Sequence, residues 1–317
     1  MILSVTLNPC IDVLLKVKGL KPNDTNRVQS KEIDAGGKGI NLARVAAEIG
    51  GSVVATGFLG GANGLLVKDV MDAQAGLTHN FVTTAVETRM NFSVEDGSGK
   101  PPTTFNAPGE TVTEEEWNQL LQIVDENLQS GGWITLGGSI PPGVPDNAYE
   151  VLIEMAKTKG VKVALDADGE LLRQTLKLGV DLVKPNQNEA GRLLGYQVKH
   201  MHDVIEGSQE IARMMEKNGS QNPVAIISLG ANGAMAANEG KVFRAYGIRI
   251  DVNSTIGSGD SFMAGLLTAT ERGDRLEHAL MMANACGAAT AVTDGTEIAR
   301  KDVVKEMVGR VKVERVA

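Results

Sequence analysis

The sequence predicts an α/β protein in which a mainly parallel β-sheet is flanked by helices and carries a small β-sheet as a lid. From about residue 40 onward, short runs rich in β-branched residues alternate with longer helical patterns, which is the pattern of βαβ units. The run 224–229 (VAIISL) is apolar apart from one serine, as expected of a strand buried on both faces. Two regions, 10–34 and 86–107, are strand-like without helices between their strands.

The elements of the main layer are expected in the following order. The expected strands include 53–58, 133–136, 161–165, 181–183 and 224–229, and the helical stretches between them include 39–49, 113–128, 146–158 and 203–217. The C-terminal part is expected to form three helices, near 259–272, 275–292 and 300–309. No repeat or low-complexity linker divides the chain, so we expect one domain over 1–317.

The regions 10–34 and 86–107 are expected to form the lid. Both alternate between apolar and polar residues, and both contain a polar turn, at 21–24 (KPND) and at 96–99 (DGSG). Extra strands inserted into an α/β domain often cover its binding site.

Composition excludes several classes of protein. The 317 residues are 42% apolar and 22% charged, which is enough for a sizeable core. The net charge is −8 and aromatic residues make up 3%, so the chain lacks the basic field and the stacking platforms of a nucleic-acid binder. Cys10 and Cys286 form no disulfide framework or zinc motif, and are expected to be free thiols. No apolar run reaches the roughly 18 residues of a membrane span, and no signal peptide is recognised, so we expect no membrane contact and a cytoplasmic location.

Glycine accounts for 37 residues, gathered in short clusters, and the strongest cluster is 257–265 (GSGDSFMAG). Here a glycine turn leads directly into an apolar helix, whose free N–H groups can hold a phosphoryl group. Asp260 is placed to accept a proton from a hydroxyl. Gly259 is expected to be required because a ligand approaches its backbone, or because its φ is positive. The alternative is that Asp260 only caps the helix.

A second glycine cluster is 36–44 (GGKGINLAR), which also precedes a helix. Lys38 supplies a positive charge, and Asn41 supplies an amide that both donates and accepts hydrogen bonds. The alternative is a loop that packs a helix closely on a sheet.

A third segment is 184–189 (KPNQNE), just after the strand at 181–183. Ligands bind at this end of strands in α/β sheets, and Asn186 and Glu189 are oxygen donors suited to Mg²⁺. The alternative is a proline turn followed by a capping residue.

Together these motifs resemble the PfkB (ribokinase-like) carbohydrate kinase family along the whole chain. The two signatures are 36–50 (GGKGINLARVAAEIG) and 254–265 (STIGSGDSFMAG), with Ser258 where the family usually has alanine. The hexose-phosphate branch, which includes 1-phosphofructokinases, tagatose-6-phosphate kinases and minor 6-phosphofructokinases, is resembled by 6–12 (TLNPCID), 88–92 (TRMNF), 136–143 (LGGSIPPG) and 184–189. The resemblance implies a ribokinase-like fold and phosphoryl transfer from ATP with Mg²⁺, and some relatives also use K⁺.

The resemblance also implies roles for individual residues. Asp260 matches the catalytic base, and the anion hole matches Gly257, Ser258 and Gly259. The sugar-contacting positions match Asp12, Gly37, Lys38, Asn41 and Ser139. The nucleotide positions match Lys184, Asn186, Ser228, Gly230, Gly233 and Asn284, and the positions associated with Mg-nucleotide match Asn186 and Glu189.

The phosphate of the substrate is expected to bind Arg27 and Arg89, one in each lid region, because the planar guanidinium suits phosphate. One such arginine would be an ordinary surface residue, whereas two beside the sugar site favour phosphate binding. The family lid often pairs with the lid of a second subunit, which would also cover the exposed sheet edges, so a homodimer is expected. The expected reaction converts fructose 1-phosphate to fructose 1,6-bisphosphate.

Alternatives remain open on the sequence alone. Within the family they are a tagatose-6-phosphate kinase, a 6-phosphofructokinase, and a kinase of a plain sugar or nucleoside, against which Arg27 and Arg89 argue. The motifs GGKGIN and NPCID favour the first of these and 1-phosphofructokinase, and no residue decides between the two. Outside the family, a dinucleotide-dependent oxidoreductase would need a GxGxxG fingerprint that is missing. A non-catalytic sugar-phosphate sensor would have no need of Asp260 as a base.

Overall fold

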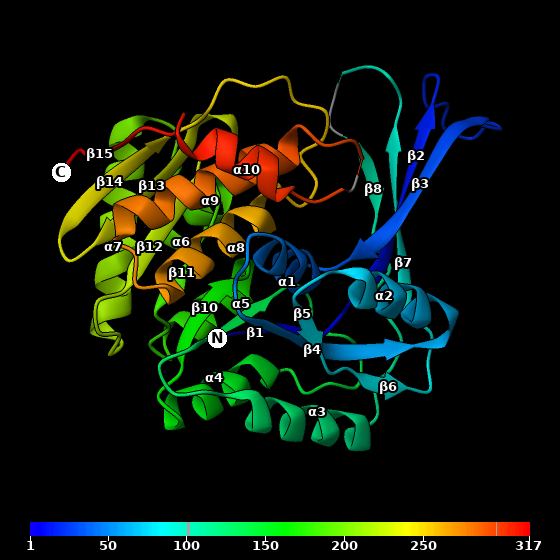
Figure 1. The fold of residues 1–317 in the computed structure, drawn as a ribbon, viewed down its shortest axis with the longest axis horizontal. Coiled ribbons are helices and arrows are strands. Elements are labelled where there is room, and N and C mark those ends of the chain that lie inside the picture. Colours follow the sequence, from blue (N-terminus) through cyan, green and yellow to red (C-terminus); the bar gives the residue numbers. More distant parts are fainter. Residues whose placement is uncertain (100–101, 296) are drawn as a thin grey trace.

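The structure, a computed structural model, describes residues 1–99, 102–295 and 297–317. Across these residues the chain forms an 11-stranded sheet with helices on both faces, and a separate 4-stranded sheet (Figure 1). The larger sheet has the strand order β15-β14-β13-β12-β11-β10-β9-β1-β4-β5, and β6 pairs with β4 off this path.

The larger sheet is mainly parallel, as predicted. Its strands are β1 (Ile2–Thr6), β4 (Val53–Gly60), β5 (Leu77–His79), β6 (Val82–Thr84), β9 (Trp133–Gly137), β10 (Lys162–Asp166), β11 (Leu182–Val183), β12 (Val224–Ser228), β13 (Gly233–Asn238), β14 (Lys241–Tyr246) and β15 (Val313–Arg315). In this sheet, all the pairs among β5, β6, β4, β1, β9, β10, β11 and β12 are parallel. Only the end formed by β13, β14 and β15 is antiparallel within the described residues.

Helices cover both faces of this sheet because its strands are apolar on both faces. The helices are α1 (Lys38–Glu48), α2 (Gly61–Ala73), α3 (Glu114–Asn127), α4 (Ala148–Thr158), α5 (Gly169–Leu176), α6 (Gln187–Leu194), α7 (Met201–Lys217), α8 (Ser258–Glu271), α9 (Leu276–Ala291) and α10 (Lys301–Val308). In β1, Ile2 joins the core formed with α1, α8, α9 and α10, whereas Leu3 and Val5 join the core formed with α3, α4 and α7. Successive side chains of a strand point to opposite faces, so one strand supplies both cores. None of the helices in the described ranges is long and apolar enough to cross a membrane.

The C-terminal helices α8 and α9 pack against each other at very short range. A Cβ atom on Gly265 would lie 2.8 Å from Cys286 Sγ, so the contact requires glycine at this position. Cys10 and Cys286 are both buried and unpaired, which confirms the prediction of free thiols.

The 4-stranded sheet is the predicted lid. Its strands are β2 (Cys10–Val17), β3 (Val28–Gly36), β7 (Arg89–Glu95) and β8 (Thr103–Phe105), in the order β3-β2-β7-β8. In Figure 1 these strands rise beside α1 and α2, at one end of the larger sheet. Of the predicted range 86–107, residues 100 and 101 lie outside the described residues.

Candidate active site

The predicted motifs meet at the carboxyl ends of the parallel strands. There β1, β9, β10 and β11 face the N-termini of α1 and α8, whose N-cap residues are Gly37 and Gly257. Both glycines have a positive φ, of 120° and 72°, so the chain turns sharply into each helix. α1 also packs very closely on β1: a Cβ atom on Gly39 would lie 2.4 Å from Thr6 Oγ1. The close-packing alternative for this glycine cluster is therefore correct for Gly39. Its neighbours Gly37, Lys38 and Asn41 line a cavity instead.

Asp260 lies in the first turn of α8 with its carboxyl group buried. Its Oδ2 accepts a hydrogen bond of 2.9 Å from Asn41 Nδ2. The helix-capping alternative for Asp260 is wrong, because the N-cap is Gly257 and no side chain caps this end. Burial, and then the negative charge of Asp166, raise the pKa of Asp260 to about 6. The group is therefore ionised at neutral pH and basic enough to accept a proton from a hydroxyl.

Asp166, which was not predicted as a site residue, forms ion pairs with two lysines that were, Lys38 and Lys184. Its carboxylate accepts from Lys38 Nζ at 2.8 Å through one oxygen and pairs with Lys184 Nζ at 3.2 Å through the other. Burial alone would raise the pKa of Asp166, but the two lysine charges outweigh burial and hold it below its ordinary value. The available signal was its position at the carboxyl end of a predicted strand, where polar residues of α/β sheets gather.

A cavity of about 270 Å³ lies against Asp260. It brings together six of the seven predicted substrate residues: Asp12, Gly37, Lys38, Asn41, Arg89 and Ser139. Gly257 also lines this cavity, which we call the acceptor cavity. Arg27 lines none of the described cavities and is exposed just before β3. The structure therefore does not bring the two predicted arginines together within one subunit.

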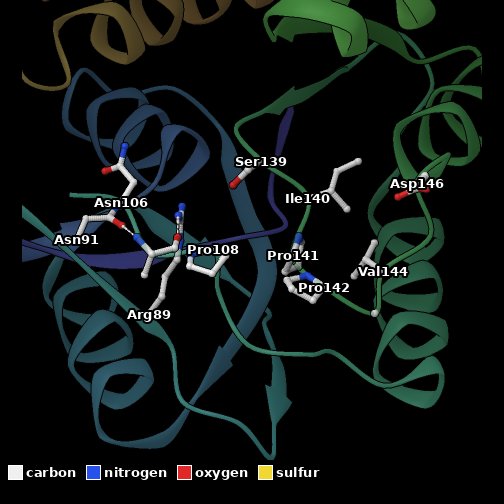
Figure 2. Close-up of a pocket in the computed structure, with 12 residues that line it drawn as sticks. Arg89, Asn91, Asn106, Pro108, Ser139, Ile140, Pro141, Pro142, Val144 and Asp146 are labelled. Carbon is white, nitrogen blue, oxygen red and sulfur yellow. Dashed lines mark hydrogen bonds between the residues drawn. The ribbon is translucent and has the colours of Figure 1, made fainter. Parts of the chain in front are cut away.

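The wall of the acceptor cavity at Arg89 is held by a hydrogen-bonded network that the sequence did not reveal. Arg89 Nη1 donates to Ala107 O at 2.5 Å and Nη2 donates to Asn8 O at 2.9 Å. Asn91 Oδ1 accepts from Ala107 N at 3.1 Å, while its Nδ2 donates to Asp12 Oδ1 at 3.1 Å. Figure 2 shows Arg89 and Asn91 pointing to the same segment. The lid strand β7 therefore fixes both the cavity wall and the carboxylate of Asp12.

Asn8 links the same wall to the opposite loop. Its Nδ2 donates to Pro108 O at 2.9 Å and to Ser139 Oγ at 2.9 Å. Beyond Ser139 the acceptor cavity opens into a second space of about 660 Å³, bordered by Pro108 on one side and by Pro141 on the other (Figure 2).

A larger cavity of about 680 Å³ lies on the other side of the first turn of α8. It is lined by all six residues predicted for the nucleotide: Lys184, Asn186, Ser228, Gly230, Gly233 and Asn284. Ser258 and Gly259 line it as well. The two cavities therefore adjoin the same glycine turn, with Gly257 and Asp260 facing one and Ser258 and Gly259 facing the other.

The predicted metal residues Asn186 and Glu189 form a capping box at the start of α6. Asn186 Oδ1 accepts from the N–H groups of Asn188 and Glu189, each at 2.9 Å, and Glu189 Oε2 accepts from Asn186 N at 2.7 Å. The capping alternative is thus correct, and it leaves Oε1 of Glu189 as the oxygen without a recorded bond in the described structure. No group of three or more His, Cys, Asp or Glu residues in the described ranges could hold a metal by itself. A Mg²⁺ ion bound mainly by phosphates and waters fits these residues, because it needs only one or two protein carboxylates.

The chain is similar to known proteins over nearly its whole length. The family model described as pfkB family carbohydrate kinase matches residues 3–302. A 1-phosphofructokinase from Borreliella burgdorferi is 31% identical over 315 residues, which cover 99% of this chain and 98% of the relative.

Two crystal structures of phosphofructokinase-2 from Escherichia coli have closely similar folds. The one in complex with substrates and products superposes with a TM-score of 0.89 at 28% identity, and covers 98% of each chain. The one in complex with potassium gives a TM-score of 0.87 at 29% identity, also over 98% of each chain.

Proposed function

The chain belongs to the pfkB family of carbohydrate kinases, and on this basis we propose that it phosphorylates a ketohexose phosphate, specifically O6 of fructose 1-phosphate. Membership of the family makes this chain a phosphotransferase, and the kinases of the family use ATP with Mg²⁺. The choice of fructose 1-phosphate is supported by the relative named 1-phosphofructokinase, which is similar over its full length. Lys38, the lysine of the GGKGIN motif, lines the acceptor cavity, and this motif favours a 1-phosphofructokinase or a tagatose-6-phosphate kinase over a minor 6-phosphofructokinase.

The observation that carries the proposal is the buried carboxyl group of Asp260, which lines the acceptor cavity while the adjacent Ser258 and Gly259 line the larger cavity. A primary hydroxyl in the acceptor cavity lies within reach of this base. A nucleotide in the larger cavity lies against the N–H groups of Ser258 and Gly259, at the positive end of α8. Phosphoryl transfer requires this arrangement of acceptor, base and anion hole.

The proposed step balances without any other reactant. The hydroxyl oxygen of the sugar attacks the terminal phosphorus of ATP, and its proton goes to Asp260. The bond from that phosphorus to the bridging oxygen breaks, and the electron pair leaves with ADP. The role of the chain is to orient the two substrates, to accept the proton and to stabilise the transferred phosphoryl group.

The phosphate that the substrate already carries is proposed to bind beside Arg89. Two carbonyl groups fix the guanidinium of Arg89, but a carbonyl does not neutralise its charge. No carboxylate pairs with Arg89 in the described part of the chain, so an anion in the cavity would be its partner. Ser139 Oγ, on the loop opposite Arg89, lines the same cavity and supplies a further hydroxyl.

Asn186 and Glu189 are proposed to hold Mg²⁺ through its waters, and the ion would neutralise charge on the phosphates of ATP. A K⁺ ion beside the anion hole is a further proposal, suggested by the potassium complex of the E. coli protein. A homodimer through the lid completes the proposal.

The test is ATP consumption measured with fructose 1-phosphate, tagatose 6-phosphate, fructose 6-phosphate and free fructose. Fructose 1-phosphate should have the highest kcat/KM. Arg89→Ala should lower kcat/KM for the phosphorylated sugars about 10–150-fold, because a hydrogen bond to a charged group contributes about 1.5–3 kcal/mol. Free fructose should be spared. Arg27→Ala belongs in the same assay, because its predicted role rests on the sequence alone.

Free fructose is the internal control of this experiment. Arg89 also supports the cavity wall, and damage to the wall would lower activity with every sugar equally. Equal losses on fructose and on the phosphates, or a preference of the wild type for fructose, would overturn the proposal.

A further inference from the structure

Arg244 lines the larger cavity at the end away from the site of phosphoryl transfer. It lies on β14, and three strand spacings separate β14 from β11, which Lys184 follows directly. With strands roughly 4.8 Å apart, Arg244 lies about 14 Å across the sheet from Lys184. An extended nucleoside triphosphate with its terminal phosphate at Lys184 and Gly259 would therefore place its base at Arg244.

The guanidinium of Arg244 is stacked on a neighbouring ring, and its charge acts on Glu314 without forming an ion pair with it. It is stacked on the ring of Tyr246, with its central carbon 4.3 Å from the ring centroid. Its Nε is buried and makes no hydrogen bond. Glu314, the acidic residue opposite Arg244 on β15, already pairs with Lys312 at 2.7 Å and accepts from the Tyr246 hydroxyl. In the part of the chain that the structure describes, Arg244 has neither an ion pair nor a hydrogen bond.

The backbone under this stack is also fixed. Asn284 Nδ2, from α9, donates to Tyr246 O at 2.7 Å, so the end of β14 is tied to the helix that forms the opposite wall of the cavity. Stacking on a fixed aromatic ring removes most of the rotational freedom that an arginine would otherwise lose on binding. Arg244 is therefore prepared to bind a ligand through its terminal nitrogens.

The chemistry of a guanidinium restricts what it can bind, because it only donates hydrogen bonds and its nitrogens lie in one plane. The edge of guanine that carries O6 and N7 offers two adjacent acceptors, which match this geometry. The same edge of adenine offers the acceptor N7 beside an amino group, which is a donor. A guanidinium at this position therefore favours a base with an oxygen at carbon 6.

We propose that Arg244 is a specificity-determining residue that contacts the base of the phosphoryl donor. Its presence raises the preference of the enzyme for 6-oxopurine triphosphates relative to ATP. This inference rests on the proposed function, because it requires a nucleotide in the larger cavity. We expect the enzyme to accept GTP and ITP as donors, and Arg244 to determine how efficiently they are used relative to ATP.

The test is the ratio of kcat/KM for MgGTP to kcat/KM for MgATP at saturating fructose 1-phosphate. Arg244→Met keeps the packing of the side chain on Tyr246 but removes the donors, and it should lower this ratio about 5–150-fold, the range for one bidentate contact to a base. The ratio for ITP should fall with that for GTP, because inosine has the same O6 and N7. Arg244→Lys keeps the charge without the planar pair of donors, and should lower the ratio to an intermediate value.

Arg315→Met is the matched control, because Arg315 is an exposed arginine on β15, the strand next to β14, and does not line the larger cavity. It should leave the ratio unchanged. An unchanged ratio in Arg244→Met, or an equal change in Arg315→Met, would overturn the inference. Melting temperatures of the variants show whether each has folded.

Calorimetric binding of non-hydrolysable GTP and ATP analogues separates this inference from the proposed function. If the wild type phosphorylates no sugar on the panel, the proposed substrate is wrong, but the ratio of the two affinities still tests Arg244. A ratio of affinities that Arg244→Met does not change would overturn the inference in that case as well.

Discussion

The charge of Asp260 is set by burial and by neighbouring side chains with opposite effects. Burial and the charge of Asp166 raise its pKa from 3.8 to about 6, against the hydrogen bond from Asn41 and the charges of Lys38 and Lys184. At neutral pH the folded protein therefore contains a buried carboxylate. A rise of this size corresponds to about 3 kcal/mol of lost conformational stability at pH 7.

Asp260→Asn tests both consequences of this carboxylate. We expect kcat to fall about 10²–10⁴-fold, because a positioned base is lost. The same variant should be more stable than the wild type at pH 7.5, by up to about 3 kcal/mol, because the amide carries no charge. The folded pKa lies above the unfolded one, so the wild type loses stability relative to the variant as the pH rises from about 4 to about 6. Urea unfolding at pH 4 and pH 7.5 measures this difference.

Wild-type kcat/KM should accordingly decline below about pH 6. Asp166→Asn is the control, since it removes a charge that raises the pKa of Asp260, and its decline should begin at a lower pH. More than half of wild-type kcat in Asp260→Asn would show that this residue is not the base. A constant difference in stability between pH 4 and pH 7.5 would show that its charge is not the cause.

At the scale of single elements, the two glycines in the turn into α8 differ in backbone conformation. Gly257 has a φ of 72°, whereas Gly259 is not among the glycines with positive φ. The expectation of a positive φ at Gly259 is therefore wrong, and the alternative of close ligand approach remains a prediction. A Cβ atom on Gly259 would have Lys184 Nζ, at 3.5 Å, as its nearest neighbour.

The two glycines should respond differently to alanine. Gly257→Ala should lower the free energy of unfolding by about 1–2 kcal/mol, because a side chain disfavours the left-handed conformation. Gly259→Ala should change stability by less than about 0.5 kcal/mol, but should lower kcat/KM for ATP, because its methyl group occupies the anion hole. Chemical unfolding and steady-state kinetics of both variants provide the comparison. Equal losses of stability would show that both positions are purely structural.

Element prediction succeeded where the signal is local and failed where it is distant. At 257–260, adjacent residues predict both the start of the helix and the position of the base. α2 was missed because its N-terminus is completed from far along the chain: Glu87 accepts from the N–H groups of Ala62 and Asn63, at 3.3 Å and 2.6 Å. The β13–β14 hairpin was not predicted either, because Ser228–Gly233 reads only as a strand that ends in a glycine turn.

The same limit applies to the site. Asp166 acquires its role from Lys38, which lies 128 residues earlier in the chain, so no local pattern reveals it. The segment 184–189 is ambiguous for a different reason: an Asn and a Glu three residues apart serve equally well as a capping box and as oxygen ligands.

At the scale of the whole molecule, the lid carries a cross-strand apolar row that is exposed at three of its four positions. Ile33, Val13, Phe92 and Phe105 are successive cross-strand neighbours on β3, β2, β7 and β8. Phe105 is 57% exposed, Ile33 43% and Phe92 39%, whereas Val13 between them is buried. Apolar rows of this kind on a small sheet are typical of a surface that a partner covers, which agrees with the predicted homodimer.

Phe105→Asp should therefore convert a dimer to a monomer, because it places a charge in this row. Light scattering coupled to size-exclusion chromatography measures the mass directly. Leu65→Asp is the control, because Leu65 is 64% exposed on α2, outside the lid, and should leave the mass unchanged. A monomeric wild type at micromolar concentration, or dissociation caused by Leu65→Asp as well, would contradict the lid interface.

The carboxylate of Asp166 has a consequence for the order of events in a catalytic cycle. It is the common counter-ion of Lys38 in the acceptor cavity and Lys184 in the larger cavity. A phosphate that draws Lys184 toward itself leaves Asp166 to Lys38 alone, and thereby alters the cation that the sugar meets. Linkage then requires each substrate to change the affinity of the other by the same factor. We expect the two substrates to bind with a mutual cooperativity that Asp166 transmits, so that a half-filled enzyme and a filled one differ in their hold on the sugar.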